Sequence, residues 1–145
     1  MKLWANNHYY YPPEPKYHIL IVDDEKSLGE TLVDYFEERY FKAFHVMNAD
    51  DAFKYLDKHR VDVVLSNVKM PGMCGIKMTE IIKRSYSARV VIFTGYGLEE
   101  IRKKAYLKGA NAFLNKPVNL KDLFELVDKL CRENVVYIGP SWTNQ

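Results

Sequence analysis

The sequence predicts a doubly wound α/β domain, in which a parallel β-sheet carries helices on both faces. Five short apolar runs alternate strictly with five segments of helical periodicity, which is the pattern of a parallel sheet covered by helices. The connections between these segments are short and suit right-handed crossovers. The length of 145 residues fits one domain of common size. These observations place the domain over residues 17–134.

Three of the predicted strands lie in the N-terminal half of the chain. They cover residues 17–22, 43–47 and 61–65, and polar residues follow the first and the third, namely Asp23-Asp24-Glu25 and Ser66-Asn67. Two amphipathic helices separate them, with apolar faces formed by Leu28, Leu32, Tyr35 and Phe36 in the first and by Ala49, Ala52, Phe53 and Leu56 in the second.

The C-terminal half continues the alternation. A helix carrying Met78, Ile81 and Ile82 precedes a strand at 90–93, a helix at 98–108 and a strand at 111–114. Gly109 stands where a left-handed residue ends a helix. The last helix follows Asn119, a suitable N-cap, and has one apolar stripe formed by Leu120, Leu123, Phe124, Val127, Leu130 and Cys131.

The flanks differ from the domain in composition. Residues 1–16 contain Tyr9-Tyr10-Tyr11-Pro12-Pro13 and are expected to be extended, either as a loosely attached leader or as an arm whose tyrosines dock on the domain or a partner. Residues 135–145 form a tail, an edge segment or the start of a linker. We expect neither flank to hold a second domain.

The composition excludes several classes of protein. A net charge of +2 with 28% charged and 48% hydrophobic residues argues against a disordered chain and against a protein that coats nucleic acid. No run approaches the roughly 18 apolar residues of a membrane span, and the N-terminus lacks a signal-peptide core. The two cysteines, Cys74 and Cys131, are too few for a disulfide scaffold, so a reducing cytoplasm is the expected compartment.

Polar residues stand at the carboxyl ends of four strands, where open α/β sheets bind ligands. They are Asp23 and Asp24, Asn67, Thr94 and Lys116. Adjacent carboxylates favour a hard cation with oxygen ligands, and Mg²⁺ is the best match. A hydroxyl and an ammonium group suit hydrogen bonding to a phosphoryl group.

These segments together resemble the receiver domain of two-component response regulators, similar to the chemotaxis regulator. The resemblance covers the α/β core in order and spacing, through Ile19-Leu20-Ile21-Val22-Asp23-Asp24-Glu25, Val63-Val64-Leu65-Ser66-Asn67-Val68-Lys69-Met70-Pro71-Gly72-Met73, Thr94-Gly95-Tyr96 and Asn115-Lys116-Pro117. It implies a flavodoxin-like fold with strand order 2-1-3-4-5 and a cis Lys116–Pro117 peptide. It also implies a signalling module and not an enzyme.

The resemblance further implies a set of roles. Mg²⁺ would be held by Asp23, Asp24, the residue at position 67 and the backbone carbonyl of Lys69. The phosphoryl group would come from a histidine kinase, a phosphotransfer protein or a small phosphodonor. Thr94, Phe113 and Lys116 take the phosphoryl-contact and switch positions. Signal output, or a homodimer, would use the face made by the fourth helix, the fifth strand and the fifth helix.

The chain departs from the family pattern at the phospho-acceptor position, which is Asn67 and not Asp. An amide is no nucleophile, because its nitrogen lone pair is delocalised and its oxygen is neutral. Aspartyl phosphorylation is therefore not expected, and Mg²⁺ binding is expected to be weak or absent. Lys116 becomes free to form an ion pair with Asp23 or Asp24. A second departure is Cys74, which we interpret as a passive loop residue.

Two explanations of Asn67 stay open. Either the natural receiver works without aspartyl phosphorylation, or an aspartate was replaced in an ordinary phospho-accepting receiver. A small flavodoxin-like enzyme or nucleotide binder is a remote third alternative, because no glycine-rich phosphate loop is present. His8, His18, His45 and His59 lack metal-ligand spacing. Nucleic-acid binding would rest only on Arg102-Lys103-Lys104, which is thin support.

Overall fold

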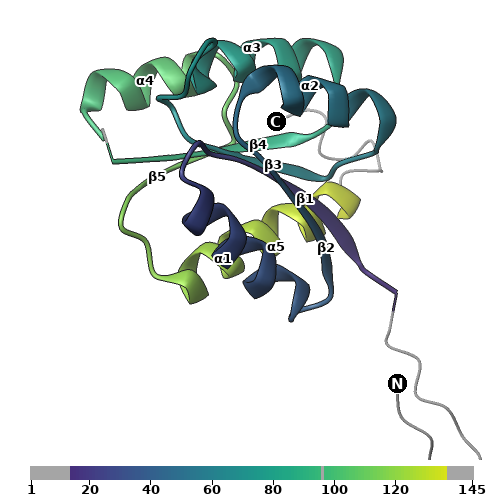
Figure 1. Ribbon diagram of the computed structural model, residues 1–145. Coiled ribbons are helices and arrows are strands. Elements are labelled where there is room, and N and C mark those ends of the chain that lie inside the picture. Colours follow the sequence, from purple (N-terminus) through teal and green to yellow (C-terminus); the bar gives the residue numbers. More distant parts are fainter. Residues whose placement is uncertain (1–13, 96, 137–145) are drawn as a thin grey trace, which may run out of the picture.

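Five parallel strands form one sheet in the order β2-β1-β3-β4-β5, as Figure 1 shows for the computed structural model, which describes residues 14–95 and 97–136. The strands are β1 (Tyr17–Val22), β2 (Phe41–Val46), β3 (Val63–Ser66), β4 (Arg89–Thr94) and β5 (Ala112–Asn115). This order confirms the predicted doubly wound, flavodoxin-like topology.

Helices cover both faces of the sheet. Helices α1 (Lys26–Glu37) and α5 (Leu120–Val136) lie on one face, and α2 (Ala49–Lys58), α3 (Gly75–Ser85) and α4 (Glu99–Leu107) lie on the other (Figure 1). Each face buries its own apolar cluster, centred on Ile21, Leu65 and Phe93 beneath α1 and α5 and on Leu20, Val64 and Ile92 beneath α2, α3 and α4. Alternate residues of the central strands supply both clusters, which explains their nearly continuous apolar sequences.

Local sequence signals set several helix ends as predicted. The Asn119 side chain accepts a hydrogen bond from the backbone N–H of Asp122 at 3.1 Å, which confirms the N-cap of α5. Gly109 follows α4 with φ at 108°, the left-handed conformation that favours glycine. Cys131 is buried among the apolar residues beneath α5, as its place on the stripe predicts.

The strands β2 and β3 each begin two residues away from their predicted starts, and the other strand ends differ by one residue or none. β2 begins at Phe41 and not at Ala43, because Phe41 is buried and pairs in register with Tyr17. β3 begins at Val63 and not at Val61, because both the backbone and the side chain of Asp62 are hydrogen-bonded to the backbone of His18. The Asp62 N–H donates to the His18 carbonyl at 2.9 Å, and its carboxylate accepts from the His18 N–H at 2.8 Å.

The flanks lie mostly outside the described residues. Of the predicted 1–16 leader only Glu14, Pro15 and Lys16 are described, and of the 135–145 tail only Val135 and Val136, which end α5. The boundaries of the predicted domain at residues 17 and 134, and the role of Tyr9–Tyr11, therefore stay predictions. Within the ranges 14–95 and 97–136, no helix has the length and apolar character needed to cross a membrane.

Candidate functional site

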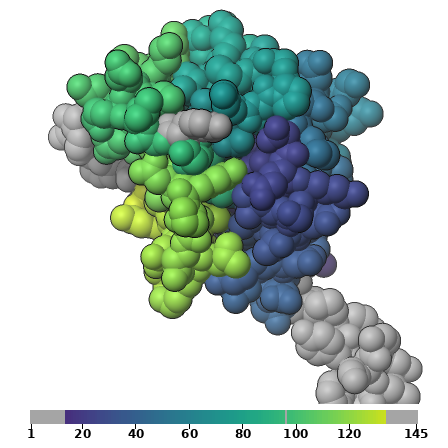
Figure 2. Space-filling model, turned by 60° about the vertical axis from the view of Figure 1, so that its left-hand side comes forward, coloured from purple at the N-terminus to yellow at the C-terminus, as the bar shows by residue number. Residues whose placement is uncertain are grey.

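The predicted polar residues meet at the carboxyl edge of the sheet. Asp23 follows β1, Asn67 follows β3, Thr94 ends β4 and Lys116 follows β5. Backbone hydrogen bonds join these ends in pairs, since the Asn67 N–H donates to the Val22 carbonyl at 2.9 Å and the Lys116 N–H donates to the Thr94 carbonyl at 2.8 Å. Figure 2 looks toward this edge, where the start of α1 in purple, helices α3 and α4 in teal and green, and the yellow-green segment after β5 come together.

An ion pair occupies the centre of this edge. Lys116 Nζ lies 2.8 Å from Asp23 Oδ2, across 93 positions of the chain. The Asp23 side chain is completely buried and its Oδ1 accepts the backbone N–H of Glu25 at 2.9 Å. The Lys116 ammonium also lies 4.7 Å from the centre of the Phe93 ring, which favours a cation on its face. The predicted pairing of Lys116 with an acidic residue is confirmed, and Asp23 is the partner.

The Asn67 side chain is turned toward its own loop. Its Nδ2 donates a hydrogen bond to the Lys69 backbone carbonyl at 2.8 Å, and the residue is buried. The start of α3 packs tightly against Asn67, since a Cβ added to Gly75 would lie 1.9 Å from the Asn67 backbone oxygen. A glycine is therefore required at position 75, and Asn67 is held on both sides.

The remaining predicted residues differ in exposure. Asp24 is exposed beside the buried Asp23, whereas Thr94 is fully buried. Phe113 is half-buried on β5 and packs against the apolar cluster beneath α2, α3 and α4. The Lys116–Pro117 peptide is cis, as the family resemblance implies.

Sequence reasoning overlooked His45. Its Nε2 lies 2.8 Å from the Asp23 backbone carbonyl oxygen, and α1 makes room for the ring at Gly29, where an added Cβ would lie 2.2 Å from Nε2. His45 is thus a second residue that fixes the chain at Asp23. The sequence contains a signal for this role, because His45 is a polar residue one position before the end of a strand that neighbours β1.

The donor atoms at this edge are of the kind that Mg²⁺ takes. Two carboxylates, an amide oxygen and a main-chain carbonyl are all hard oxygen donors. In the structure, however, Lys116 is bonded to Asp23 and the Asn67 amide nitrogen is bonded to the Lys69 carbonyl. Within the described residues, no three His, Cys, Asp or Glu side chains are grouped so that they could hold a metal ion. The residues fit Mg²⁺ in type, with two of the donors already engaged.

Comparison with known proteins identifies the family. The family model described as the response regulator receiver domain matches residues 19–128. The chain belongs to the response regulator receiver domain family. This receiver domain is 32% identical over 132 residues to the heme response regulator HssR of Staphylococcus saprophyticus, covering 87% of this chain and 59% of that protein. It is 26% identical over 117 residues to HssR of Staphylococcus aureus, covering 80% of this chain and 52% of that protein. The chain thus spans about half the length of these curated relatives.

Solved structures agree with this assignment. A CheY-like receiver domain protein from Methanospirillum hungatei superposes with a TM-score of 0.77 at 25% identity, covering 81% of this chain and 94% of that one. The receiver domain of a signal transduction histidine kinase from Syntrophus aciditrophicus superposes with a TM-score of 0.75 at 27% identity, covering 86% and 96%. Receiver domains are signalling modules that interact with histidine kinases and output domains, and they generally bind Mg²⁺ at an acidic pocket.

Proposed function

We propose that this receiver domain signals through protein–protein contacts without forming an aspartyl phosphate. The observation that carries the proposal is Asn67, which follows β3 at the carboxyl edge and which the family resemblance assigns to the phospho-acceptor position. A carboxylate attacks phosphorus with a charged oxygen, whereas the amide oxygen of Asn67 is neutral and its nitrogen is a donor. The hydrogen bond from Nδ2 to the Lys69 carbonyl uses this donor, which a carboxylate could not do.

Weakened Mg²⁺ binding is part of the same proposal. The ligand set would be Asp23, Asp24, the Asn67 amide oxygen and the Lys69 carbonyl. An amide in place of a carboxylate removes one negative charge from this set. The Lys116 ammonium on Asp23 and the Asn67 amide N–H on Lys69 also compete for two of the ligands. Mg²⁺ would have to displace both contacts, and Thr94 and Lys116 would lack a phosphoryl group to bind.

The proposed docking face is formed by α4, β5 and α5. Three large apolar side chains are exposed at or next to α4, with Leu98 61%, Tyr106 40% and Leu107 84% exposed. Such side chains are costly to leave in water and favour a protein partner at this face. The partner would be a histidine kinase, a phosphotransfer protein, an output protein or a second copy. Phe113 lies on β5, two residues before the Asn115 that pairs with Thr94, which supports switch positions at Phe113 and Thr94.

The remaining parts of the proposal concern compartment and activity. Both cysteines are free thiols, which supports a reducing cytoplasm. We propose no enzymatic turnover, because the site lacks a nucleophile, and we propose neither a membrane nor a nucleic acid as partner. Lys103 and Lys104 on α4 are exposed, and one such pair supports nucleic-acid binding only thinly.

Intact mass spectrometry tests the missing nucleophile. The protein and its Asn67→Asp variant are each incubated with Mg²⁺ and acetyl phosphate. A phosphoryl adduct is expected on the variant alone. The matched control is Asn111→Asp, because Asn111 lies away from the carboxyl edge and uses its side-chain oxygen to accept the Val90 N–H at 2.9 Å. An adduct on the parent protein at the level of the Asn67→Asp variant contradicts the proposal. No adduct on that variant shows that the pocket lacks more than the nucleophile.

A further inference from the structure

The sheet has an open edge at β2, at the opposite end of the strand order from β5. In the described residues β2 pairs only with β1, in register from Tyr17 with Phe41 to Val22 with Val46. The Val46 carbonyl accepts the Asp23 N–H at 3.0 Å, so the backbone groups of Val46 point toward β1. Backbone direction alternates along a parallel ladder. The N–H and C=O groups of Phe41, Ala43 and His45 therefore point outward from the sheet.

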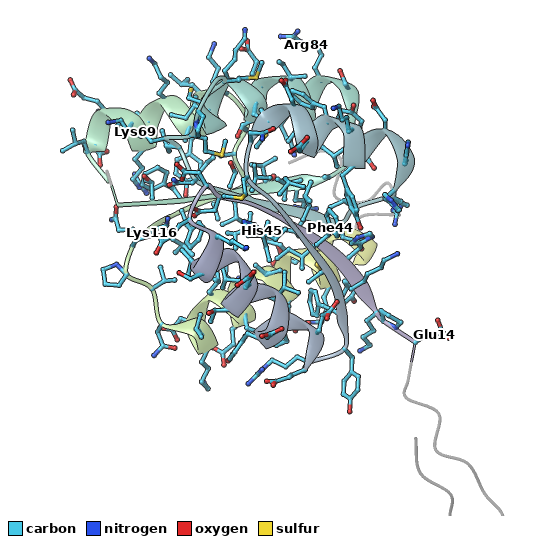
Figure 3. All side chains as sticks on the ribbon, viewed as in Figure 1. Glu14, Phe44, His45, Lys69, Arg84 and Lys116 are labelled. Carbon is cyan, nitrogen blue, oxygen red and sulfur yellow. The ribbon has the colours of Figure 1, made fainter. Side chains whose placement is uncertain are left out.

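Three stacked rings, from Phe44 of β2 and from Tyr55 and His59 at α2, lie beside this edge. The Phe44 and Tyr55 rings are stacked at 4.4 Å with an interplanar angle of 8°, and Tyr55 and His59 are stacked at 4.1 Å. The Tyr55 hydroxyl is hydrogen-bonded to His18 Nε2, which fixes the central ring of the stack. Phe44 is 45% exposed, and in Figure 3 it lies away from Lys69 and Lys116. A rigid ring with an open face is thus presented at the edge strand.

A groove of about 590 Å³ runs between β2 and α2 beside this stack. Its lining includes Phe44, Met47, Lys54, Tyr55, Lys58 and His59. Met47 is 39% exposed, so two of the large apolar side chains left in water belong to the groove. Edge strands with exposed apolar side chains are prone to pair with another chain.

The groove and the strand next to it carry more positive than negative side chains. Lys54 and Lys58 of α2 line the groove together with one carboxylate, Asp51. Lys42 lies outside this lining, two residues before Phe44 on the same face of β2. None of these three lysines has a carboxylate within ion-pair distance in ranges 14–95 and 97–136, whereas most other basic residues on the helices form ion pairs. The carboxylates of Asp51 and Asp57 are hydrogen-bonded to the neutral side chains of Asn48 and Tyr86, which do not neutralise them, so the three lysines exceed the single carboxylate of the lining by two charges.

The chain's own flanks do not supply the missing negative side chains. Neither residues 1–13 nor residues 137–145 contain an aspartate or a glutamate. The leader is aromatic and carries Lys2, so its charge has the same sign as the groove. Charge complementarity therefore points to a separate acidic segment.

We infer that the β2 edge binds an extended acidic peptide of a partner protein, which adds a sixth strand to the sheet. Backbone hydrogen bonds to Phe41, Ala43 and His45 would give the strand its register. Alternate side chains of the peptide would face α2, where an aromatic residue stacks on Phe44 and acidic residues approach the three lysines. This surface contains neither Asn67 nor any residue of α4, so its test is independent of Asn67.

A defined probe tests the inference with the full chain. The peptide acetyl-Glu-Thr-Tyr-Thr-Glu-Thr-Glu-amide, labelled with fluorescein, places its acidic residues and its tyrosine on one face of a strand. Binding is measured by fluorescence anisotropy at low ionic strength. Lys42→Glu and Lys54→Glu are each expected to weaken binding about fivefold. The matched control Lys104→Glu, an exposed lysine on α4, is expected to leave binding unchanged.

Amide hydrogen exchange by NMR tests the strand addition itself. The peptide is expected to slow exchange of the Ala43 and His45 N–H groups, which point to the open edge. The N–H groups of Phe44 and Val46 already face β1 and are expected to change little. Phe44→Ser is expected to weaken binding of this peptide more than binding of a version with Thr in place of Tyr.

Any one of five results overturns the inference. The first is that the full chain does not bind the peptide. The second is that Lys104→Glu loses as much affinity as Lys42→Glu and Lys54→Glu. The third is that the peptide binds without slowing amide exchange at Ala43 and His45. The fourth is tighter binding of a labelled thymidine oligonucleotide that depends on Phe44, which would make the groove a nucleic-acid site. Concentration-dependent dimerisation abolished by Phe44→Ser would show that a second copy is the occupant, and it also contradicts the inference.

Discussion

Replacing Lys116 by methionine tests how much the ion pair at the carboxyl edge stabilises the fold. Methionine keeps much of the length and apolar stem of lysine but removes the ammonium group. The Asp23 carboxylate would then stay buried without its cation, while still accepting the Glu25 N–H. An unpaired buried charge is unfavourable because the protein interior solvates it poorly.

The geometry sets the expected magnitude. At the 2.8 Å separation of Lys116 Nζ and Asp23 Oδ2, the Coulomb attraction is about 1.5 kcal/mol in water and about 6 kcal/mol at an effective dielectric constant near 20. The Asp23 side chain is fully buried and Lys116 is 20% exposed, so the environment lies between these limits. We expect Lys116→Met to lower the free energy of unfolding by about 3 kcal/mol, at the lower end for a broken buried pair.

Urea denaturation followed by circular dichroism measures this loss. Lys121→Met is the matched control, because its pair with Glu125 has the same 2.8 Å distance but side chains that are 75% and 59% exposed. We expect a much smaller loss there, because solvent screens an exposed pair. Adding Asp23→Asn to Lys116→Met removes the unpaired charge and is expected to recover part of the stability. The reasoning is refuted if Lys116→Met loses no more than Lys121→Met, or if the double variant is no more stable than the single one.

Three other predictions use different readouts. Asn67→Asp exchanges an amide donor for a carboxylate that faces the Lys69 carbonyl, so in EDTA it is expected to lower the free energy of unfolding by about 1–3 kcal/mol. Mg²⁺ is expected to restore this loss, as urea denaturation would show. The stability of the control variant Asn111→Asp is expected to be the same in EDTA and in Mg²⁺. Burial lowers the pKa of His18 from its ordinary value of 6.5, so the unfolded chain binds the proton first as pH falls. Stability is therefore fully present above pH 6.5 and declines toward the folded pKa, and His18→Gln is expected to flatten this decline in melting temperature; an unchanged decline would assign it to other groups. Burial raises the pKa of Cys131 to about 12 while Cys74 is exposed, so a disulfide reagent at about pH 8 is expected to label only Cys74 until the protein unfolds, and rapid labelling of both thiols contradicts this.

Strand ends could be predicted because they depend on local sequence. The apolar run of β1 stops at Asp23 and that of β4 stops at Thr94, and this change from apolar to polar residue type is read directly along the chain. Helical periodicity located α5 and its cap at Asn119 for the same local reason. Boundaries at Phe41 and Val63 were less accurate, because burial of one aromatic ring and the hydrogen bonds of Asp62 depend on neighbours distant in sequence.

The sequence by itself determined the α/β alternation, the acidic pair, and the amide at position 67, because residue identity and periodicity are properties of the chain. Only the tertiary structure decided which atoms meet. Lys116 pairs with Asp23 and not with the adjacent exposed Asp24, because the sheet order brings residues 93 positions apart to one edge and buries only one of the two acids. The same order leaves β2 open, with Phe44 and three unpaired lysines beside it. Neither outcome is visible in sequence, since both depend on how distant strands pack.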